Sequence, residues 1–464
     1  MAKISKVYRF LVYVLPAVLF FSYYPVISLG ASESMNFELS LPLIWLVIFD
    51  VVAFIIMVQK KILFNDCRRI WAWLLFPIFA TLSVLWSMNF LRGVLTAGIL
   101  WLIYFAGYAF WNLKSLFLEF NFKEKFWKVF FGSSLIVCGW CFLQCILDLA
   151  GVPRDASLMC AGCTYKMFGF PHPNGFAIEP QFMGNLLIAP AVLSAWFALK
   201  NKKYFWMFSL FSVTIFLTFS RGAIYAFMIA MIFMTVMEAV WQKSWKICKT
   251  FLIVAVAFLF TLNLQGVMAQ IGPTSDTYAM GVAKVLNHLS LGIIDIRENN
   301  EGLSEEVEAF AVEKTDEKES EPEREAIFDG YVAESTDTRV RLTDAAVNVW
   351  KRDFKTVVFG VGLGGAGQAL YVNGLSPAPK EIVQNEYASS LLETGLVGII
   401  LLILTIVLIV RVMMKSAAAP MLLALVVAYA ITLLFFSGLP NALHIYLLPA
   451  LFISLYGKSS YRKR

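Results

Sequence analysis

Three arginines could bind an anion in a chain that is otherwise strongly apolar. Arg221 lies in the stretch FLTFSRGAIYAF, between two apolar segments. A guanidinium at a membrane edge is costly unless it is paired, hydrated or bound to an anion, and its planar fork suits a phosphate group. Arg339 and Arg341 open a later segment, and one of them could join Arg221 in an anion clamp. The alternatives are a snorkelling Arg221 and solvated or salt-bridged Arg339 and Arg341.

Polar side chains also gather before an apolar segment that begins near residue 393. Gln384 and Asn385 could hydrogen-bond sugar hydroxyl groups. Glu386 could act as a base, and Glu393 could pair with an arginine. The alternative is a polar cap on a membrane helix.

The stretch KMFGFPHPNGFAIEPQFMG contains His172, Asn174 and Glu179. A histidine is a natural candidate for a base, because its pKa lies near neutrality. The prolines on both sides of His172 favour an extended or turn conformation. The alternative is a merely exposed loop histidine.

The stretch VFGVGLGGAG fits the spacing of a dinucleotide-binding loop through Gly362, Gly364 and Gly367. That fingerprint requires a strand–turn–helix unit, which this stretch lacks. We therefore expect close packing of its backbone against a substrate or the membrane.

The remaining candidates are an isolated acid and two groups of cysteines. Asp50 lies inside an apolar segment, which suits either a proton-coupled transporter or a neutral carboxyl group inside a bundle. Cys138, Cys141 and Cys145 follow helical spacing. The pair Cys160 and Cys163 is too small a ligand set for structural zinc, but a disulfide is possible in an oxidising compartment. We expect no metal and no cofactor.

Composition and segment length predict a polytopic membrane protein. The 464 residues are 59% hydrophobic and 15% charged, against roughly 25% charged in soluble domains. Apolar stretches of about twenty residues match the thickness of a bilayer. The first stretch is too long for a signal peptide. We predict twelve helical spans at residues 8–30, 41–58, 71–88, 93–113, 127–149, 182–199, 204–219, 222–240, 250–269, 393–413, 419–437 and 443–457.

Lysines and arginines lie in every second connection of this scheme. Examples are Lys60 and Lys61 after the second predicted span, Lys202 after the sixth and Lys243 after the eighth. Cytoplasmic loops carry such an excess of positive charge, so both termini are predicted to be cytoplasmic. The same reasoning attributes the net positive charge of the chain to cytoplasmic loops rather than to a nucleic-acid surface.

Two connections on the opposite side are long, at residues 150–181 and 270–392. The segment 297–335 is acidic and poor in aromatic residues, which predicts disorder or partial helix. Residues 338–353 and 382–392 resemble amphipathic helices. The predicted organisation is therefore a membrane part (1–269), an extracytoplasmic segment (270–392) and a second membrane part with a basic tail (393–464). The predicted fold class is all-α.

In this arrangement the chain resembles the O-antigen ligase and O-antigen polymerase superfamily of bacterial membrane glycosyltransferases. The resemblance rests on SRGA at residues 220–223, on Arg341 followed by GVGLG, and on the pattern from Asn385 through Glu393 and Gly395. The segment 179–187, EPQFMGNLL, is similar to a stretch of the polymerase branch. These motifs cover residues 170–400.

The resemblance implies an enzyme of polysaccharide or lipopolysaccharide biosynthesis in the bacterial inner membrane. Its donor would be a glycan on undecaprenyl pyrophosphate, transferred on the periplasmic face to a glycan or a lipid-linked glycan. Arginines such as Arg221 and Arg341 would hold the pyrophosphate, with Arg339, Asn174, Glu179 and Glu393 as further substrate contacts. The ligase branch has a histidine where this chain has Gln384, which favours a polymerase-like enzyme or one whose base is Glu386 or His172.

Two other classes remain open on the sequence. Twelve spans with both termini inside are also typical of a transporter or a lipid-glycan flippase, and Asp50 would suit proton coupling. A scaffold could use the acidic segment to bind a basic partner, including another protein of glycan assembly. Against the transporter, the polar signals gather in the outer connections.

Overall fold

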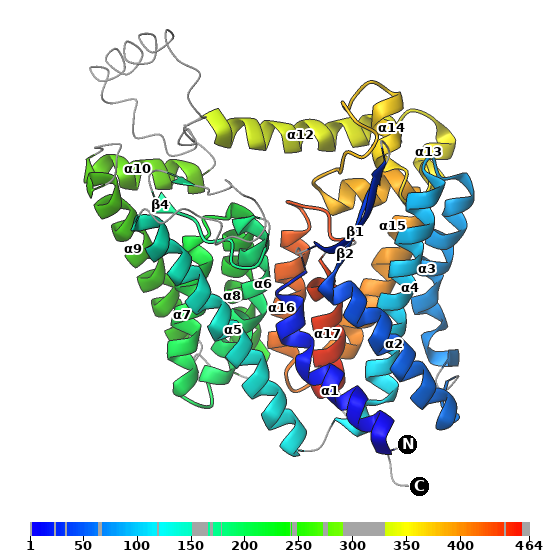
Figure 1. Ribbon diagram of the computed structural model, residues 1–464, viewed down its shortest axis with the longest axis horizontal. Coiled ribbons are helices and arrows are strands. Elements are labelled where there is room, and N and C mark those ends of the chain that lie inside the picture. The colour runs from blue at the N-terminus through cyan, green and yellow to red at the C-terminus, as the bar shows by residue number, and fades with distance from the viewer. Residues whose placement is uncertain are drawn as a thin grey trace.

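The computed structural model describes most of the chain as helices. The described residues are 2–22, 25–32, 35–63, 67–117, 120–150, 166–167, 170–177, 179–241, 243, 248–271, 277–290, 330–439 and 442–456. The helices of the bundle are α1 (Ala2–Leu19), α2 (Leu41–Gln59), α3 (Cys67–Ser83), α4 (Phe90–Asn112), α5 (Phe120–Leu149), α6 (Pro180–Ala198), α7 (Lys203–Leu217), α8 (Arg221–Trp241), α9 (Cys248–Ile271), α15 (Glu386–Met413), α16 (Ala419–Thr432) and α17 (Leu443–Tyr456) (Figure 1).

Each of the twelve predicted spans overlaps one of these helices, although the bounds differ. Among the described residues, seven helices are long and apolar enough to cross a bilayer, namely α2, α4, α5, α6, α8, α9 and α15. Four apolar stretches are shorter, at Ala72–Trp86, Lys203–Leu217, Ala419–Thr432 and Leu443–Tyr456. A polytopic helical bundle is therefore supported, whereas the number of spans stays a prediction.

The first predicted span is wrong in its second half. Helix α1 ends at Leu19, and strands β1 (Pro25–Ser32) and β2 (Met35–Ser40) pair antiparallel after it. Proline at the start of β1 removes a backbone donor, and the β-branched residues that follow it fit a strand better than a helix. A second short pair, β3 (Lys166–Met167) with β4 (Phe170–Pro171), lies before α6. The all-α prediction therefore holds for the bundle but not for these two hairpins.

Helix α6 lies inside the bundle. It contacts α7, α8 and α16, and most of its residues are buried. Gly184, Ala191 and Ala195 are fully or almost fully buried on it, and such small residues let neighbouring helices approach closely. A Cβ atom at Gly184 would lie 2.7 Å from the Cβ atom of Ala223 on α8. This close packing fixes the beginning of α6 against the beginning of α8.

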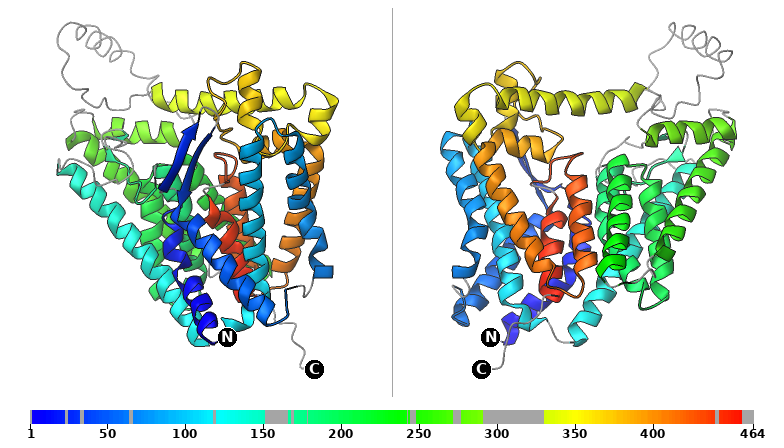
Figure 2. Two further views of the ribbon diagram at one scale, coloured as in Figure 1. Left: turned by 45° about the vertical axis from the view of Figure 1, so that its right-hand side comes forward. Right: turned by 180° about the vertical axis from the view of Figure 1, so that it is seen from behind.

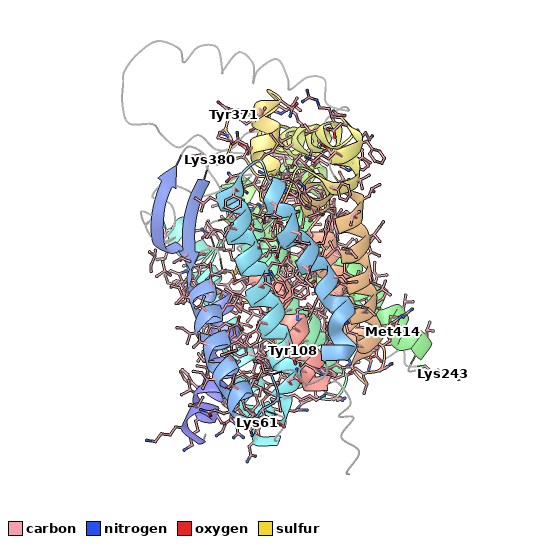
Figure 3. All side chains as sticks on the ribbon, turned by 90° about the vertical axis from the view of Figure 1, so that its right-hand side faces the viewer. Lys61, Tyr108, Lys243, Tyr371, Lys380 and Met414 are labelled. Atoms are coloured by element: carbon pink, nitrogen blue, oxygen red, sulfur yellow. The ribbon has the colours of Figure 1, made fainter. Side chains whose placement is uncertain are left out.

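A layer of four helices described outside the bundle covers one of its ends. It contains α10 (Tyr278–Leu289), α12 (Gly330–Trp350), α13 (Phe354–Phe359) and α14 (Ala366–Val372). Figures 1 and 2 show this layer at the end opposite the N-terminus, with α12 running across the bundle axis. Figure 3 shows Tyr371 and Lys380 at this end and Lys61 and Lys243 toward the other. We call the layered end the outer end, because the charge pattern of the connections predicts that it faces away from the cytoplasm.

The two amphipathic helices predicted in the outer segment have different outcomes. Helix α12 contains the predicted residues 338–350 and begins earlier, at Gly330. The acidic residues 297–329 lie outside the described part of the chain, as do Cys160 and Cys163. The second helix does not begin at residue 382 but at Glu386, because the Asn385 side chain accepts hydrogen bonds from the N–H groups of Tyr387 and Ala388 and caps it.

The glycine-rich stretch is packed between helices. The N–H of Gly362 donates to the carbonyl oxygen of Glu393 (2.9 Å), and Ser87 donates to the carbonyl oxygen of Leu363 (2.7 Å). Gly360 has φ +73°, and Gly395, at the kink of α15, has φ +61°. The backbone of this stretch is closely packed, but its partners are α15 and the turn before α4 rather than the substrate or membrane that the sequence suggested.

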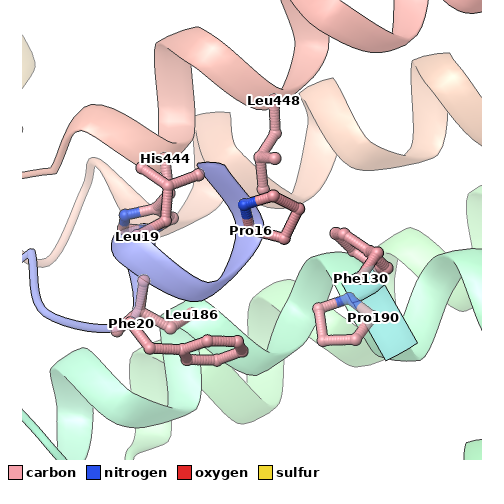
Figure 4. A pocket seen from close by; sticks show the side chains of 8 residues that line it. All are labelled: Pro16, Leu19, Phe20, Phe130, Leu186, Pro190, His444 and Leu448. Carbon is pink, nitrogen blue, oxygen red and sulfur yellow. The ribbon is translucent and has the colours of Figure 1, made fainter. Parts of the chain in front are cut away.

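A small apolar cavity lies within the bundle, among α1, α5, α6 and α17 (Figure 4). It is lined by Pro16, Leu19, Phe20, Phe130, Leu186, Pro190, His444 and Leu448. None of these side chains carries a fixed charge, so this cavity does not suit the polar part of a substrate.

A pair of glycine substitutions tests the packing of this stretch. Gly360→Ala places a Cβ atom against the backbone of Glu393 and Thr394, whereas Gly374 (φ +71°) has no atom within 4 Å of the corresponding position. Gly374→Ala should cost about 1 kcal/mol through backbone conformation alone. Gly360→Ala should cost clearly more, about 3 kcal/mol, because the backbone of α15 must move as well. Thermal unfolding in detergent compares the two variants, and equal losses of stability would contradict the close approach.

Candidate functional site

A chain of polar contacts connects three distant segments at the outer end. Arg339 on α12 donates from Nε to Oε1 of Gln384 (2.8 Å) and from Nη2 to Oε1 of Gln181 (3.0 Å). Gln181 on α6 in turn donates from Nε2 to Oε2 of Glu179 (2.7 Å). The two amide oxygens, of Gln384 and Gln181, fix the orientation of the Arg339 guanidinium group. The site therefore joins the start of α6, the middle of α12 and the residues that precede α15.

Arg221 lies at the same place in the bundle, as the first residue of α8. The Ser220 side chain caps this helix by accepting a hydrogen bond from the N–H of Ala223 (3.3 Å). The charges of Arg221 and Arg339 are close enough to repel each other. Arg221 is half-buried, and the Tyr225 hydroxyl group, one turn further along α8, donates to the carbonyl oxygen of Leu289. Two positive charges this close to each other attract an anion strongly.

Glu179 is the acid of this chain of contacts. It is partly buried, and burial raises the pKa of its carboxyl group, while Arg339 and the hydrogen bond from Gln181 act against that rise. A carboxylate whose pKa moves toward neutrality can accept a proton more readily than an exposed one. Its place beside Arg339 brings a potential base within the site.

Arg339 and Arg341 project from different faces of α12. Leu342, Ala346 and Val349 are buried, and Arg339 precedes Leu342 by one turn on that face. Arg341 is exposed, on the face of the helix that also carries Asp344 and Asn348. The structure therefore brings Arg339, rather than Arg341, to Gln181 and Gln384. The helical spacing of Leu342, Ala346 and Val349 is the signal in the sequence that could have distinguished them.

The residues around the start of α15 cap this helix and hydrogen-bond to neighbouring segments of the fold. Asn385 caps the helix, and Oε2 of Glu386 accepts hydrogen bonds from the Ser437 hydroxyl group (2.9 Å) and the N–H of Gly438 (2.7 Å). Glu393 accepts from the N–H of Ala366 (3.3 Å), and Arg92 is close enough to act on its charge. These contacts give Asn385, Glu386 and Glu393 structural roles beside the site.

His172 and Asn174 are buried, so His172 is not the merely exposed loop histidine that was the alternative to a base. The side chain of Gln144 on α5 donates to Oδ1 of Asn174 (3.0 Å) and accepts from the N–H of Gly175 (2.9 Å). Nδ1 of His172 lies 3.3 Å from the carbonyl oxygen of Thr218. This loop is thus fixed between α5 and the turn before α8, and the imidazole of His172 is buried there.

Sequence reasoning missed Gln181, Tyr225 and His288. The stretch EPQFMG was noted, but nothing in the sequence distinguishes its glutamine from other amides. Nε2 of His288 lies 3.1 Å from the carbonyl oxygen of Phe219, two residues before Arg221. Only the fold brings α10 to this turn.

The described ranges contain no group of three or more His, Cys, Asp or Glu side chains that could hold a metal ion. Within these ranges Cys138, Cys141 and Cys145 are buried in the bundle.

Both carboxyl oxygens of Asp50 are buried without a hydrogen-bond partner in the described part of the chain, and the phenol of Tyr8 on α1 is close enough to interact electrostatically with this carboxyl group. Asp50 is therefore part of the packing between α1 and α2.

Comparison with known families confirms the resemblance noted in the sequence. Residues 206–403 match the family described as O-antigen ligase. No curated protein matches the chain. The matched range includes Arg221, Arg339 and Gln384 but not Glu179 or Gln181. It indicates a membrane glycosyltransferase of the O-antigen ligase and polymerase superfamily, acting in polysaccharide or lipopolysaccharide biosynthesis.

The burial of His288 predicts an acid-dependent loss of stability. Burial, and secondarily the charge of Arg221 and the neighbouring His172, lower the pKa of His288 from 6.5 to about 3, against the opposing effect of its bond to Phe219. Between these values the unfolded chain binds a proton that the folded chain does not, so this contribution to stability is complete above pH 6.5 and is lost as the pH falls toward 3. His288→Gln removes this titration.

Melting temperatures of both proteins, measured from about pH 7 to about pH 4, check this expectation. The parent chain should lose more stability over this range than His288→Gln. Parallel curves would mean that His288 is protonated as easily in the folded chain as in the unfolded one.

Proposed function

We propose that the protein transfers a glycan from an undecaprenyl-pyrophosphate donor to a glycan acceptor at the outer end of its bundle. The observation that carries this proposal is a pair of guanidinium groups close enough to repel each other, Arg221 and Arg339, with the partly buried carboxyl group of Glu179 beside Arg339. Residues so far apart in the chain meet at the end where a lipid headgroup would lie. The pair suits a leaving group that carries two phosphates.

In this mechanism the arginines bind the leaving group. The bond between the anomeric carbon and the pyrophosphate oxygen breaks, and the negative charge that develops on this oxygen is stabilised by Arg221 and Arg339. Gln181 and Gln384 orient Arg339, as their hydrogen bonds to Nη2 and Nε indicate. No metal ion is needed for this step, since the two guanidinium groups supply the positive charge.

Glu179 is the base that we propose for the acceptor. Its carboxylate takes the proton of the attacking hydroxyl group, whose oxygen forms the new bond to the anomeric carbon. Three observations favour Glu179 as the base over Glu386 and His172, the two bases suggested by the sequence. It adjoins Arg339, whereas Glu386 is engaged with Ser437 and Gly438, and His172 faces the carbonyl oxygen of Thr218.

A polymerase-like reaction, in which the acceptor is itself a lipid-linked glycan, is the form we favour. Gln384 stands at the position of the ligase histidine, and its side-chain oxygen is already bound to Arg339. An amide cannot take a proton near neutral pH. Ligation to lipid A core or another acceptor is the alternative, and the two differ only in the molecule that supplies the attacking hydroxyl group.

The proposed setting is the bacterial inner membrane, with both termini in the cytoplasm and the site on the periplasmic face. The lysines toward the N-terminal end of the bundle and the layer of α10, α12, α13 and α14 at the other end support this orientation (Figure 3). Membrane lipid and other proteins of glycan assembly would be its partners.

Alanine substitutions of the arginines test donor binding. In vesicles that contain the purified protein and a lipid-linked oligosaccharide, Arg221→Ala and Arg339→Ala should each lower kcat/KM at least about a hundredfold, because a charge-assisted contact to the leaving group is lost. Lys351→Ala, an exposed charge near the end of α12, is the control. Arg341→Ala should lower kcat/KM less than Arg339→Ala, since Arg341 is exposed.

Full activity of both Arg221→Ala and Arg339→Ala would remove the pyrophosphate role. The same assay with lipid-linked glycan or lipid A core as acceptor distinguishes polymerase from ligase.

Glu179→Gln tests the base separately from the donor site. The amide keeps a partner for Gln181 but cannot accept a proton, so kcat should fall by at least about a hundredfold while the KM for the donor changes little. Quench-flow measurement of glycan transfer at saturating donor gives this rate. A raised donor KM with an unchanged kcat would instead make Glu179 a binding residue.

A further inference from the structure

The turn before Arg221 has an unfavourable backbone conformation. Phe219, between α7 and α8, has φ +48°, in the left-handed region that side chains other than glycine rarely adopt. Such a conformation persists only where the surroundings hold it. Two residues later the chain presents the guanidinium that the proposed function depends on.

Two histidines from separate segments bind the carbonyl groups of this turn. Nδ1 of His172 lies 3.3 Å from the carbonyl oxygen of Thr218, and Nε2 of His288 lies 3.1 Å from that of Phe219. A carbonyl oxygen can only accept, so each of these ring nitrogens carries the hydrogen. The two imidazoles are therefore donors to consecutive carbonyl groups.

Each histidine is fixed in turn by another part of the bundle. His172 belongs to the loop that the Gln144 side chain ties to α5 through Asn174 and Gly175. It also lies against the Phe219 ring, with 4.6 Å between ring centroids. On the other side, α10 packs along α9, and the Tyr225 hydroxyl group donates to the carbonyl oxygen of Leu289, next to His288.

Apolar side chains and a close helix contact also pack against the Thr218–Phe219 turn. Phe219 is buried with Leu262 of α9 and Val285 of α10. Gly184 of α6 leaves no space, because a Cβ atom there would lie 2.9 Å from Oγ1 of Thr218. The turn is thus held by residues from α6, α9 and α10 and by the loop that carries His172.

We propose that His172 and His288 are positioning residues that clamp the Thr218–Phe219 turn and hold Arg221 in place against the repulsion of Arg339. Without them, the strained turn would relax and the two like charges would move apart. The consequence for the donor rests on the proposed function, whereas the clamp itself does not.

The clamp can be measured without any substrate. Ser220 is buried within the turn, so Ser220→Cys places a thiol there that should react slowly with a membrane-impermeant maleimide. In the parent chain the same reagent gives the background from its own cysteines, such as the exposed Cys248. Adding His172→Leu and His288→Leu should raise the labelling rate of the introduced thiol about tenfold, because two buried carbonyl groups lose their donors.

A matched pair of variants separates the lost hydrogen bonds from a general loss of folding. Asparagine can replace Nδ1 of His172, and glutamine can replace Nε2 of His288, each with an amide N–H at a similar distance from the backbone. His172→Asn with His288→Gln should therefore restore slow labelling. An unchanged rate in the leucine variants, or equal acceleration in the leucine and the amide variants, would overturn the clamp.

Kinetics then connect the clamp to the donor site. The leucine variants should raise the KM for the lipid-linked donor about tenfold and leave the KM for the acceptor unchanged, and the amide variants should recover the parent value. Rapid labelling with an unchanged donor KM would overturn the link to Arg221. If the parent chain transfers no glycan, the proposed function fails, and the labelling experiment still decides whether the clamp exists.

Discussion

Arg221 and Arg339 carry like charges that act on each other, so the outer end must hold both side chains in position. Two guanidinium groups at the edge of an apolar bundle repel more strongly than they would in water, because the surrounding helices lower the dielectric constant. Such a pair persists only where the backbone and the neighbouring side chains oppose its separation. Gln181 and Gln384 hold Arg339, and the turn before α8 holds Arg221. The same repulsion makes the pair attractive to an anion.

Helix α12 carries Arg339 to this site because the part of the helix that follows Arg339 is anchored to the membrane bundle. Leu342, Ala346 and Val349 pack into a cluster that includes Leu370 and Leu392 from α14 and α15. That cluster is fixed by the glycine-rich stretch, whose backbone lies between α15 and the turn that begins α4. The glycines therefore matter to the site through the position of α12, although they are not part of it.

The polar residues near the start of α15 show how one sequence pattern serves two purposes. Gln384 contacts Arg339, whereas Asn385 caps the helix and Glu386 binds the segment after α16. Three adjacent residues point in different directions because the chain changes from an extended segment to a helix between them. Their proximity in the sequence is thus a poor guide to a shared role.

The sequence by itself determined the helical bundle, since long apolar stretches must satisfy their backbone groups internally in a bilayer, and this requirement is local. The alternation of basic connections followed from the sequence in the same way. The spacing of Leu342, Ala346 and Val349 indicates which side of α12 is buried, but only the tertiary structure brings Gln181 and Gln384 to Arg339 on that side. The tertiary structure also decided that His288 lies against Phe219 and that His172 is enclosed. Contacts between residues so distant in the chain depend on how the helices pack, which no single segment specifies.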